Sequence, residues 1–277
     1  MRMSKLSVII HTYNSERYLK YVLESVKFAD EIIIADMGST DKTIEIAKRY
    51  KCCIKNIKKL KFADPARAKI YKEAKGDFVL VLDSDEVLSN TLQKSILEIL
   101  QKNDKNTVYN IPRVNWLLGT ATLPTKKGRG AFDRQIRLSP RNSLIYTGKV
   151  HEQPVLKNNY KLINLEINKG HIEHFSHVGS SDLFMRGDVY ARLEAERIIE
   201  KNKKPSSQLL HFILFFIKFI KSGNYKFGFK SFLIFYSELT YRINVLIKLY
   251  EIKHHDEEKV LKKYFTYLKN QEKSAKE

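Results

Sequence analysis

The sequence predicts an α/β fold in which a mixed, mostly parallel sheet is flanked by helices and followed by a C-terminal helical extension. Three patterns lead to this prediction. Short apolar runs alternate with segments of helical periodicity over the first hundred residues, shorter strand-like segments of alternating polarity follow, and the pattern is helical from residue 180 onward. Strands that are apolar throughout are typical of parallel sheets covered on both faces, so the first hundred residues fit that class.

The first part of the chain supplies the parallel strands and the helices between them. Ser, Thr or Asp residues precede the helical segments, and Ser15, for example, can cap the first helix by accepting a hydrogen bond from a free backbone N–H group. The stretch "ADPARAKIYKEAKG" combines Asp64 as N-cap with Pro65 at the first helical position and Gly76 as the helix end. Ser89 or Asn90 is expected to cap the helix that follows. The apolar runs expected as strands lie at 6–11, 31–36, 52–57 and 78–82.

We expect two domains, residues 1–178 and 179–277. Within the first, residues 1–106 carry the parallel strands, and residues 107–178 extend the sheet with shorter strands joined by a Gly- and Lys-rich loop at 125–130. In the second domain the apolar run "QLLHFILFFIKFI" has 13 residues. That is shorter than the roughly 20 residues that span a bilayer.

The C-terminal helices place aromatic and aliphatic side chains along helical stripes, with most lysines and arginines off them. We interpret them as an in-plane anchor at an anionic membrane surface. The alternative is that they pack on the first domain or on a second subunit, which would make a homo-oligomer.

The chain carries a formal net charge of +19, from 50 Lys and Arg against 31 Asp and Glu residues. This balance suits nucleic acid, an acidic lipid surface or phosphorylated substrates, with a lysine-rich solvated surface as the simpler alternative. A nucleic-acid-binding protein is disfavoured, because the aromatic residues gather in apolar stripes and no binding motif for nucleic acid is found. The adjacent Cys52 and Cys53 fit a reducing compartment, and the N-terminus lacks a signal-peptide cleavage site, so we expect a cytoplasmic protein.

The stretch "GDFVLVLDSDE" ends a buried strand in three acids. Asp83 and Asp85 point to the same side if the extended geometry persists, and their carboxylates repel each other unless a cation or a shared proton relieves them. A divalent cation, completed by water and phosphate oxygens, fits this position because open parallel sheets bind ligands at the carboxyl ends of their strands. The alternatives are acids that only cap the next helix and a glycosidase pair, which is disfavoured because both carboxylates approach from one side.

Three motifs in order, "VIIHTYNSE", "IIIADMGSTDKT" and "GDFVLVLDSDE", each end a predicted strand. With them, residues 5–178 resemble the family 2 glycosyltransferases, enzymes of the GT-A fold that use nucleotide sugars. A later "GKVHE" makes the chain most similar to the lipopolysaccharide-core β-1,4-glucosyltransferase-like branch. The Gln-x-x-Arg-Trp motif of processive synthases is absent from the sequence, which implies the addition of one sugar per encounter.

The resemblance implies that residues 1–106 bind the nucleotide sugar and residues 107–178 the acceptor. The residues expected to bind the UDP-sugar are Thr12, Tyr13, Asn14, Glu16, Asp36, Arg67, Asp83 and Ser84. The expected ligands of Mn²⁺ or Mg²⁺ are Asp83, Asp85 and His174. The simpler alternatives are that Asp36 only begins the turn at Gly38, that Arg67 is a solvated helix residue, and that the histidines of "HIEHFSH" are unrelated loop residues.

Inverting sugar transfer needs a base that removes the acceptor proton. Glu152 in "GKVHEQP" is the first choice, because the branch that the chain resembles carries His-Glu there, and Asp133 in "AFDRQIR" is the second. The alternative is that Glu152 only pairs with a basic side chain. The predicted reaction moves a hexose or N-acetylhexosamine from a UDP-sugar to a hydroxyl of a cell-surface glycan or glycolipid precursor, at the inner face of the cell membrane. A protein or peptide side chain is the alternative acceptor.

Overall fold

The computed structural model describes residues 3–57, 69–117, 119–121, 133–146, 153–177, 179–201, 207–221, 225, 228–254 and 261–267. The described residues form two compact units. The first unit holds the residues up to Ser176 apart from 117–120, and the second holds those from His177 onward together with 117–120.

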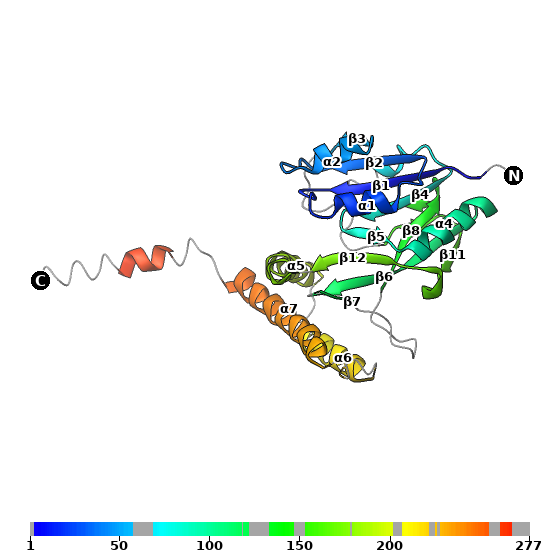
Figure 1. Ribbon diagram of the computed structural model, residues 1–277. Helices are drawn as coiled ribbons and strands as arrows, with labels where there is room; N and C mark the ends of the chain where they lie inside the picture. The colour runs from blue at the N-terminus through cyan, green and yellow to red at the C-terminus, as the bar shows by residue number, and fades with distance from the viewer. Residues whose placement is uncertain are drawn as a thin grey trace, which may run out of the picture. The chain divides into compact units, whose positions relative to one another are not determined.

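The first unit is built on a mixed sheet with the strand order β3-β2-β1-β4-β8-β6-β12-β5, shown in Figure 1. The strands are β1 (Leu6–Thr12), β2 (Glu31–Asp36), β3 (Cys53–Asn56), β4 (Phe78–Asp83), β5 (Glu86–Leu88), β6 (Thr107–Leu117), β7 (Thr120–Ala121), β8 (Asp133–Pro140), β11 (Lys161–Asn164) and β12 (Ile172–His177). Strands β1 to β4 pair in parallel, β11 pairs in parallel with β6, and β8 and β12 run antiparallel to their neighbours. The predicted mixed, mostly parallel sheet is confirmed. A separate two-stranded sheet joins β9 (Leu144–Ile145) and β10 (Val155–Leu156).

Both faces of the central strands are covered, as the continuous apolar runs predict. Alternate residues of β1 and β4 point to opposite faces. Val8 and Leu80 lie in one core with helices α1 (Leu19–Ser25), α2 (Thr43–Arg49) and α4 (Asn90–Lys102). Ile9 and Val81 lie in a second core on the other face, with Ile70 and Tyr71. Removing both sets from water is the main source of stability for such a sheet.

Helix α4 begins as the sequence predicts, because the hydroxyl of Ser89 accepts a hydrogen bond from the backbone N–H of Leu92 at 3.3 Å. It ends at Asn103, whose left-handed φ of 52° is tolerated by asparagine. A one-turn 3-10 helix, η1 (Ile167–Lys169), packs beside α4, where Lys169 accepts a hydrogen bond from Ser95.

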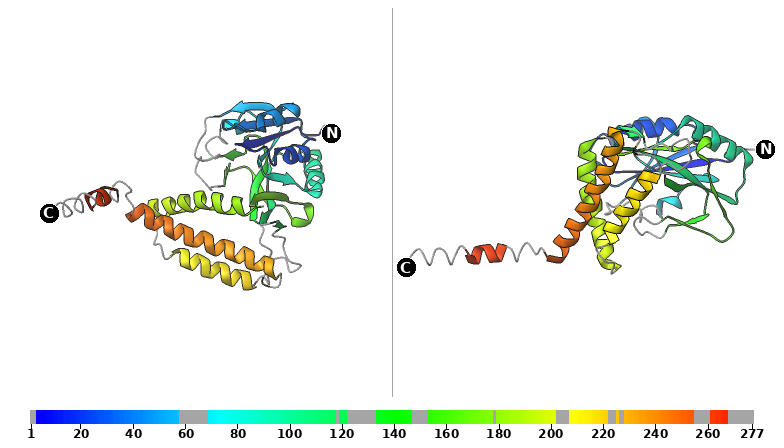
Figure 2. Two further views of the ribbon diagram at one scale, coloured as in Figure 1. Left: turned by 60° about the vertical axis from the view of Figure 1, so that its left-hand side comes forward. Right: turned by 90° about the horizontal axis from the view of Figure 1, so that it is seen from below.

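The second unit consists of helices α5 (Ser180–Glu200), α6 (Ser207–Lys221) and α7 (Phe229–His254), followed by a helical segment at 261–267. Figure 2 shows the three long helices side by side. Helices α5 and α7 share a small core of Ala191, Ala195, Ile198, Val245 and Leu249. Among the described helices, none combines the length and the hydropathy needed to cross a membrane.

Candidate functional site

The end of β2 forms a tight turn that is organised by Asp36. Its carboxylate accepts hydrogen bonds from the backbone N–H groups of Gly38 (2.9 Å) and Ser39 (2.8 Å) and from the hydroxyls of Ser39 (2.6 Å) and Thr12 (2.8 Å). Gly38 has a φ of +85°, which glycine adopts without strain. Four hydrogen bonds fill the lone pairs of a buried carboxylate, so Asp36 shapes the turn here. Direct contact between Asp36 and a nucleotide stays a prediction.

The loop after β1 is fastened to the loop after β2. Asn14, at a φ of 47°, accepts a hydrogen bond from the backbone of Thr40 at 2.8 Å through its side-chain oxygen. Glu16 accepts one from the backbone of Lys42 at 3.0 Å. Between them, the side chain of Tyr13 is exposed. The predicted nucleotide-binding residues of these two loops therefore meet at one edge of the sheet.

Ser15 does not cap helix α1, so that prediction was wrong. The helix begins at Leu19 without a side-chain cap. Instead, the hydroxyl of Ser15 accepts a hydrogen bond from the backbone of Tyr13 at 3.2 Å and donates one to the hydroxyl of Ser84 at 2.7 Å. The contact fastens the β1 loop to the acidic turn after β4, which brings a third predicted strand end to the same edge.

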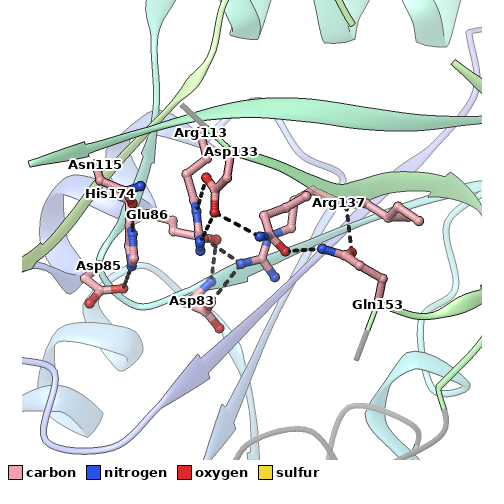
Figure 3. A network of polar contacts seen from close by, with 11 residues as sticks. Asp83, Asp85, Glu86, Arg113, Asn115, Asp133, Arg137, Gln153 and His174 are labelled. Atoms are coloured by element: carbon pink, nitrogen blue, oxygen red, sulfur yellow. Dashed lines mark hydrogen bonds and ion pairs between the residues drawn. The ribbon is translucent and has the colours of Figure 1, made fainter. Parts of the chain in front are cut away.

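The acidic turn after β4 is held by a buried ion-pair network, drawn in Figure 3. The carboxylate of Glu86 is fully buried and accepts hydrogen bonds from Arg137 at 2.5 Å, from Arg113 at 3.0 Å and from the backbone N–H of Asp83 at 3.0 Å. The same guanidinium nitrogen of Arg137 also reaches the Oδ2 of Asp83 at 2.7 Å. Glu86 is therefore a structural acid, and Asp83 is held by an arginine from β8.

The two arginines remain charged although they are buried. Burial alone would lower the pKa of Arg137, but the nearby carboxylates of Glu86 and Asp83 outweigh it and raise that pKa. Arg113 makes a two-pronged contact with Asp133, at 3.1 Å and 2.5 Å. The four carboxylates of Asp83, Asp85, Glu86 and Asp133 thus face two guanidiniums. The cluster has an excess of negative charge, which favours a cation.

Asp85 and His174 form the part of the cluster best suited to hold a cation. The Nδ1 of His174 lies 2.6 Å from the side-chain oxygen of Asn115. Because that oxygen can only accept, Nδ1 carries the proton, and the Nε2 of a neutral ring presents its lone pair. Nε2 lies 3.6 Å from the Oδ1 of Asp85. Two electron-pair donors facing each other at this distance are relieved by a proton or by a shared metal ion.

The donor set fits a divalent ion that is only partly held by protein. Among the residues that the structure describes, no group of three or more His, Cys, Asp or Glu side chains could hold a metal. A carboxylate oxygen with an imidazole nitrogen suits Mn²⁺ better than Mg²⁺, which prefers oxygen alone. Water and phosphate oxygens would complete the coordination. Of the three predicted metal ligands, Asp85 and His174 are brought together, whereas Asp83 faces Arg137.

Several predicted site residues cannot be placed. Arg67 and the first-choice base Glu152 lie outside the described residues. The second choice, Asp133, lies on β8, where its carboxylate accepts hydrogen bonds from Arg113 and, at 3.2 Å, from Gln135. Both assignments of the base stay predictions.

Sequence reasoning missed Glu86, Arg113, Asn115 and Arg137. A signal for three of them was present, because the polar residues of "RVNW" and "DRQIR" occupy alternate positions. Residues two apart on a strand share a face. Arg113 and Asn115 therefore belong to one face of β6, and Asp133 and Arg137 to one face of β8.

The ion pair of Asp133 and Arg113 predicts a specific loss of stability in acid. Burial alone would raise the pKa of Asp133, but Arg113 holds that pKa below its ordinary value. Below about pH 4 the unfolded chain takes up a proton at Asp133 that the folded state resists, so the free energy of unfolding falls as the pH falls through the folded-state pKa. We expect Asp133→Asn to lose less of its free energy of unfolding than the unmodified protein between about pH 6 and about pH 3. Urea unfolding at both pH values measures the difference, and equal losses would contradict it.

The chain is similar to known proteins over much of its length. The family model described as glycosyl transferase family 2 matches residues 7–151. The lipopolysaccharide core biosynthesis glycosyltransferase LpsC of Rhizobium meliloti is 25% identical over 258 residues, which are 89% of this chain and 92% of LpsC. The poly(ribitol-phosphate) beta-N-acetylglucosaminyltransferase TarS of Staphylococcus aureus is 30% identical over 118 residues, which are 38% of this chain and 20% of TarS. A crystal structure of S. aureus TarS 1-349 in complex with UDP-GlcNAc is 26% identical, with a TM-score of 0.33, over 41% of this chain and 34% of that one.

The family match begins in β1 and includes all three strand ends described above. It covers more than half of the chain. This protein therefore belongs to glycosyl transferase family 2 and is a glycosyltransferase.

Proposed function

We propose that this glycosyltransferase moves a hexose or N-acetylhexosamine from a UDP-sugar to a hydroxyl of a cell-surface glycan or glycolipid precursor, one sugar per encounter. The observation that carries the proposal is the pair of Asp85 and His174, whose donor atoms face each other at 3.6 Å beside the loops that hold the predicted nucleotide-binding residues. The names of the relatives, which refer to lipopolysaccharide core and poly(ribitol-phosphate), support an envelope glycan as the acceptor.

The nucleotide would lie on the loops after β1 and β2. The exposed ring of Tyr13 offers a flat apolar face to the base. Asn14 and Glu16 shape this surface by fastening the two loops together, and the turn held by Asp36 closes its far side. Asp83 and Ser84 would face the ribose and the diphosphate, together with Arg67.

Asp85 and His174 would hold a divalent ion, Mn²⁺ or Mg²⁺, together with the diphosphate. When bound, such an ion acts as a Lewis acid that stabilises the negative charge on the leaving UDP. Asn115 orients the ring of His174 so that Nε2 points to Asp85. Arg137 neutralises Asp83 and so reduces the repulsion between that acid and the phosphates.

The transfer itself needs a base and an in-line approach. The acceptor hydroxyl gives its proton to the carboxylate of Glu152, or of Asp133 as the second choice, while its oxygen attacks the anomeric carbon. The bond between that carbon and the diphosphate oxygen breaks on the opposite face. UDP leaves with the bonding electrons, and the anomeric configuration inverts.

Thermal unfolding in the presence of nucleotides tests the proposal directly. UDP together with Mn²⁺ is expected to raise the melting temperature, because a ligand that binds only the folded state adds about 2.7 kcal/mol at a hundred times its Kd. UDP alone or Mn²⁺ alone should produce a much smaller shift. GDP with Mn²⁺ is the control. A shift that ignores Mn²⁺ would contradict the metal role, and no shift with any nucleotide would contradict the donor.

A further inference from the structure

Helix α6 is apolar around its whole circumference. On one side Phe212, Phe215 and Phe219 pack against Phe235 of α7, with ring centroids 5.4 to 6.4 Å apart. On the other side large apolar side chains remain 43–60% exposed. These side chains, which we call the α6 face, are Leu209, Leu210, Ile213, Leu214, Phe216, Ile217 and Ile220. A helix that is apolar all round is normally buried in protein or in lipid.

Helix α7 adds an exposed aromatic ladder close to its N-terminus. The rings of Phe229, Phe232 and Tyr236 stack on one another, with centroids 6.0 and 6.1 Å apart. All three are exposed. Aromatic residues are enriched at the boundary between lipid and water, where flat rings fit among the headgroups.

The charge of this part of the chain has a single sign. Residues 201–237 contain no Asp or Glu, although the chain has 31 acidic residues in all. The same stretch contains the lysines 201, 203, 204, 218, 221, 226 and 230. Lys221, at the end of α6, is exposed. A surface that is apolar and lysine-rich is complementary to an apolar layer covered by anionic groups.

The other occupants fit less well. A helix of 15 residues is about 22 Å long, too short for a hydrocarbon core of about 30 Å. A second copy of the chain, related by a twofold axis, would bring the same patch against itself. That arrangement would set the lysines of residues 201–237 against one another without an acid from the same stretch to offset them.

We propose that the α6 face binds an anionic lipid surface, with α6 lying in the plane of the membrane interface. The apolar side chains enter the boundary between headgroups and acyl chains, and the lysines at the rim contact the lipid phosphates. The interaction needs neither nucleotide nor catalysis, so it is independent of the proposed reaction.

Sedimentation of the full chain with lipid vesicles tests the proposal. We expect binding to vesicles of phosphatidylglycerol and phosphatidylcholine, weakening as salt is raised, and little binding to phosphatidylcholine alone. Ile213→Ser with Ile217→Ser should weaken binding about ten-fold or more, because two half-buried isoleucines are lost from the interface. Lys221→Glu should weaken it at least about five-fold. Ile163→Ser is the matched control, since Ile163 on β11 is 46% exposed and Ile217 is 43% exposed.

The outcomes separate this proposal from the proposed function and from oligomerisation. Asp85→Asn should bind vesicles as the unmodified protein does, whatever its activity. Binding that ignores the phosphatidylglycerol fraction, or that survives the double serine variant, would overturn the proposal. So would a stable dimer in analytical ultracentrifugation that binds no vesicles and that the double serine variant dissociates, because α6 would then be covered by a second copy.

Discussion

Replacing Asp85 by asparagine is expected to lower the turnover of sugar transfer by about a thousand-fold or more. The amide has almost the shape of the carboxylate, but it removes the negative charge that faces the Nε2 of His174. A charge that helps to hold a Lewis acid contributes several kcal/mol to the transition state, and about 4 kcal/mol corresponds to a thousand-fold in rate. The release of UDP from a saturating UDP-sugar, with Mn²⁺ present, measures the turnover.

The matched control is Asp77→Asn, which makes the same chemical change just before the opposite end of the same strand, β4. Asp77 accepts hydrogen bonds from Lys105 at 2.8 Å and from the backbone of Lys5 at 3.0 Å, far along the strand from the acidic turn. Its turnover should stay within about two-fold of the unmodified protein. Both variants should unfold cooperatively. Unchanged turnover in a folded Asp85→Asn variant would remove the metal role from the mechanism.

The sheet was predictable because burial on both faces leaves a clear trace in the sequence. The runs at 6–11, 31–36 and 78–82 match β1, β2 and β4 within one residue at either end. The two cores explain why: Val8 and Ile9 point to opposite faces, and both are fully buried. A strand with one solvated face would instead show alternation, as the later strands do.

The ion-pair network was not predictable, because it depends on the order of strands in the sheet. Strand β8 lies between β4 and β6, although β6 precedes β8 in the chain. Only that order brings Arg137 within reach of Glu86, 51 residues earlier. The local signals in "RVNW" and "DRQIR" identify a polar face, but they do not identify its partner.

The same reasoning explains why Ser15 and Asp36 were harder to interpret. A serine before an apolar periodic segment is a good N-cap on local grounds, but a tertiary contact with Ser84 takes its hydroxyl instead. For Asp36, the alternative of a residue that begins the Gly38 turn describes its observed hydrogen bonds. Local capping and turn chemistry cannot decide between a structural and a binding role when both occur at the same strand end.

Arg137→Met is expected to lower the free energy of unfolding by about 3–5 kcal/mol. The methionine keeps the apolar stem of the arginine but leaves the buried carboxylate of Glu86 with one guanidinium in place of two. Asp83 also loses its contact with Arg137, although it is partly exposed and can be solvated. Urea unfolding at neutral pH measures the loss. Arg49→Met is the control, because Arg49 pairs with Glu45 on an exposed face of α2, where removal of an ion pair costs about 1 kcal/mol at most.

A double variant separates the buried ion pair from simple loss of packing. Glu86→Leu combined with Arg137→Met replaces both charges by apolar groups of similar size, and such replacements are often tolerated. The double variant should therefore be destabilised by less than the sum of the two single variants, with a coupling of about 2 kcal/mol or more. Additive losses would mean that Glu86 and Arg137 do not interact, and the buried network would then not explain how the acidic turn is held.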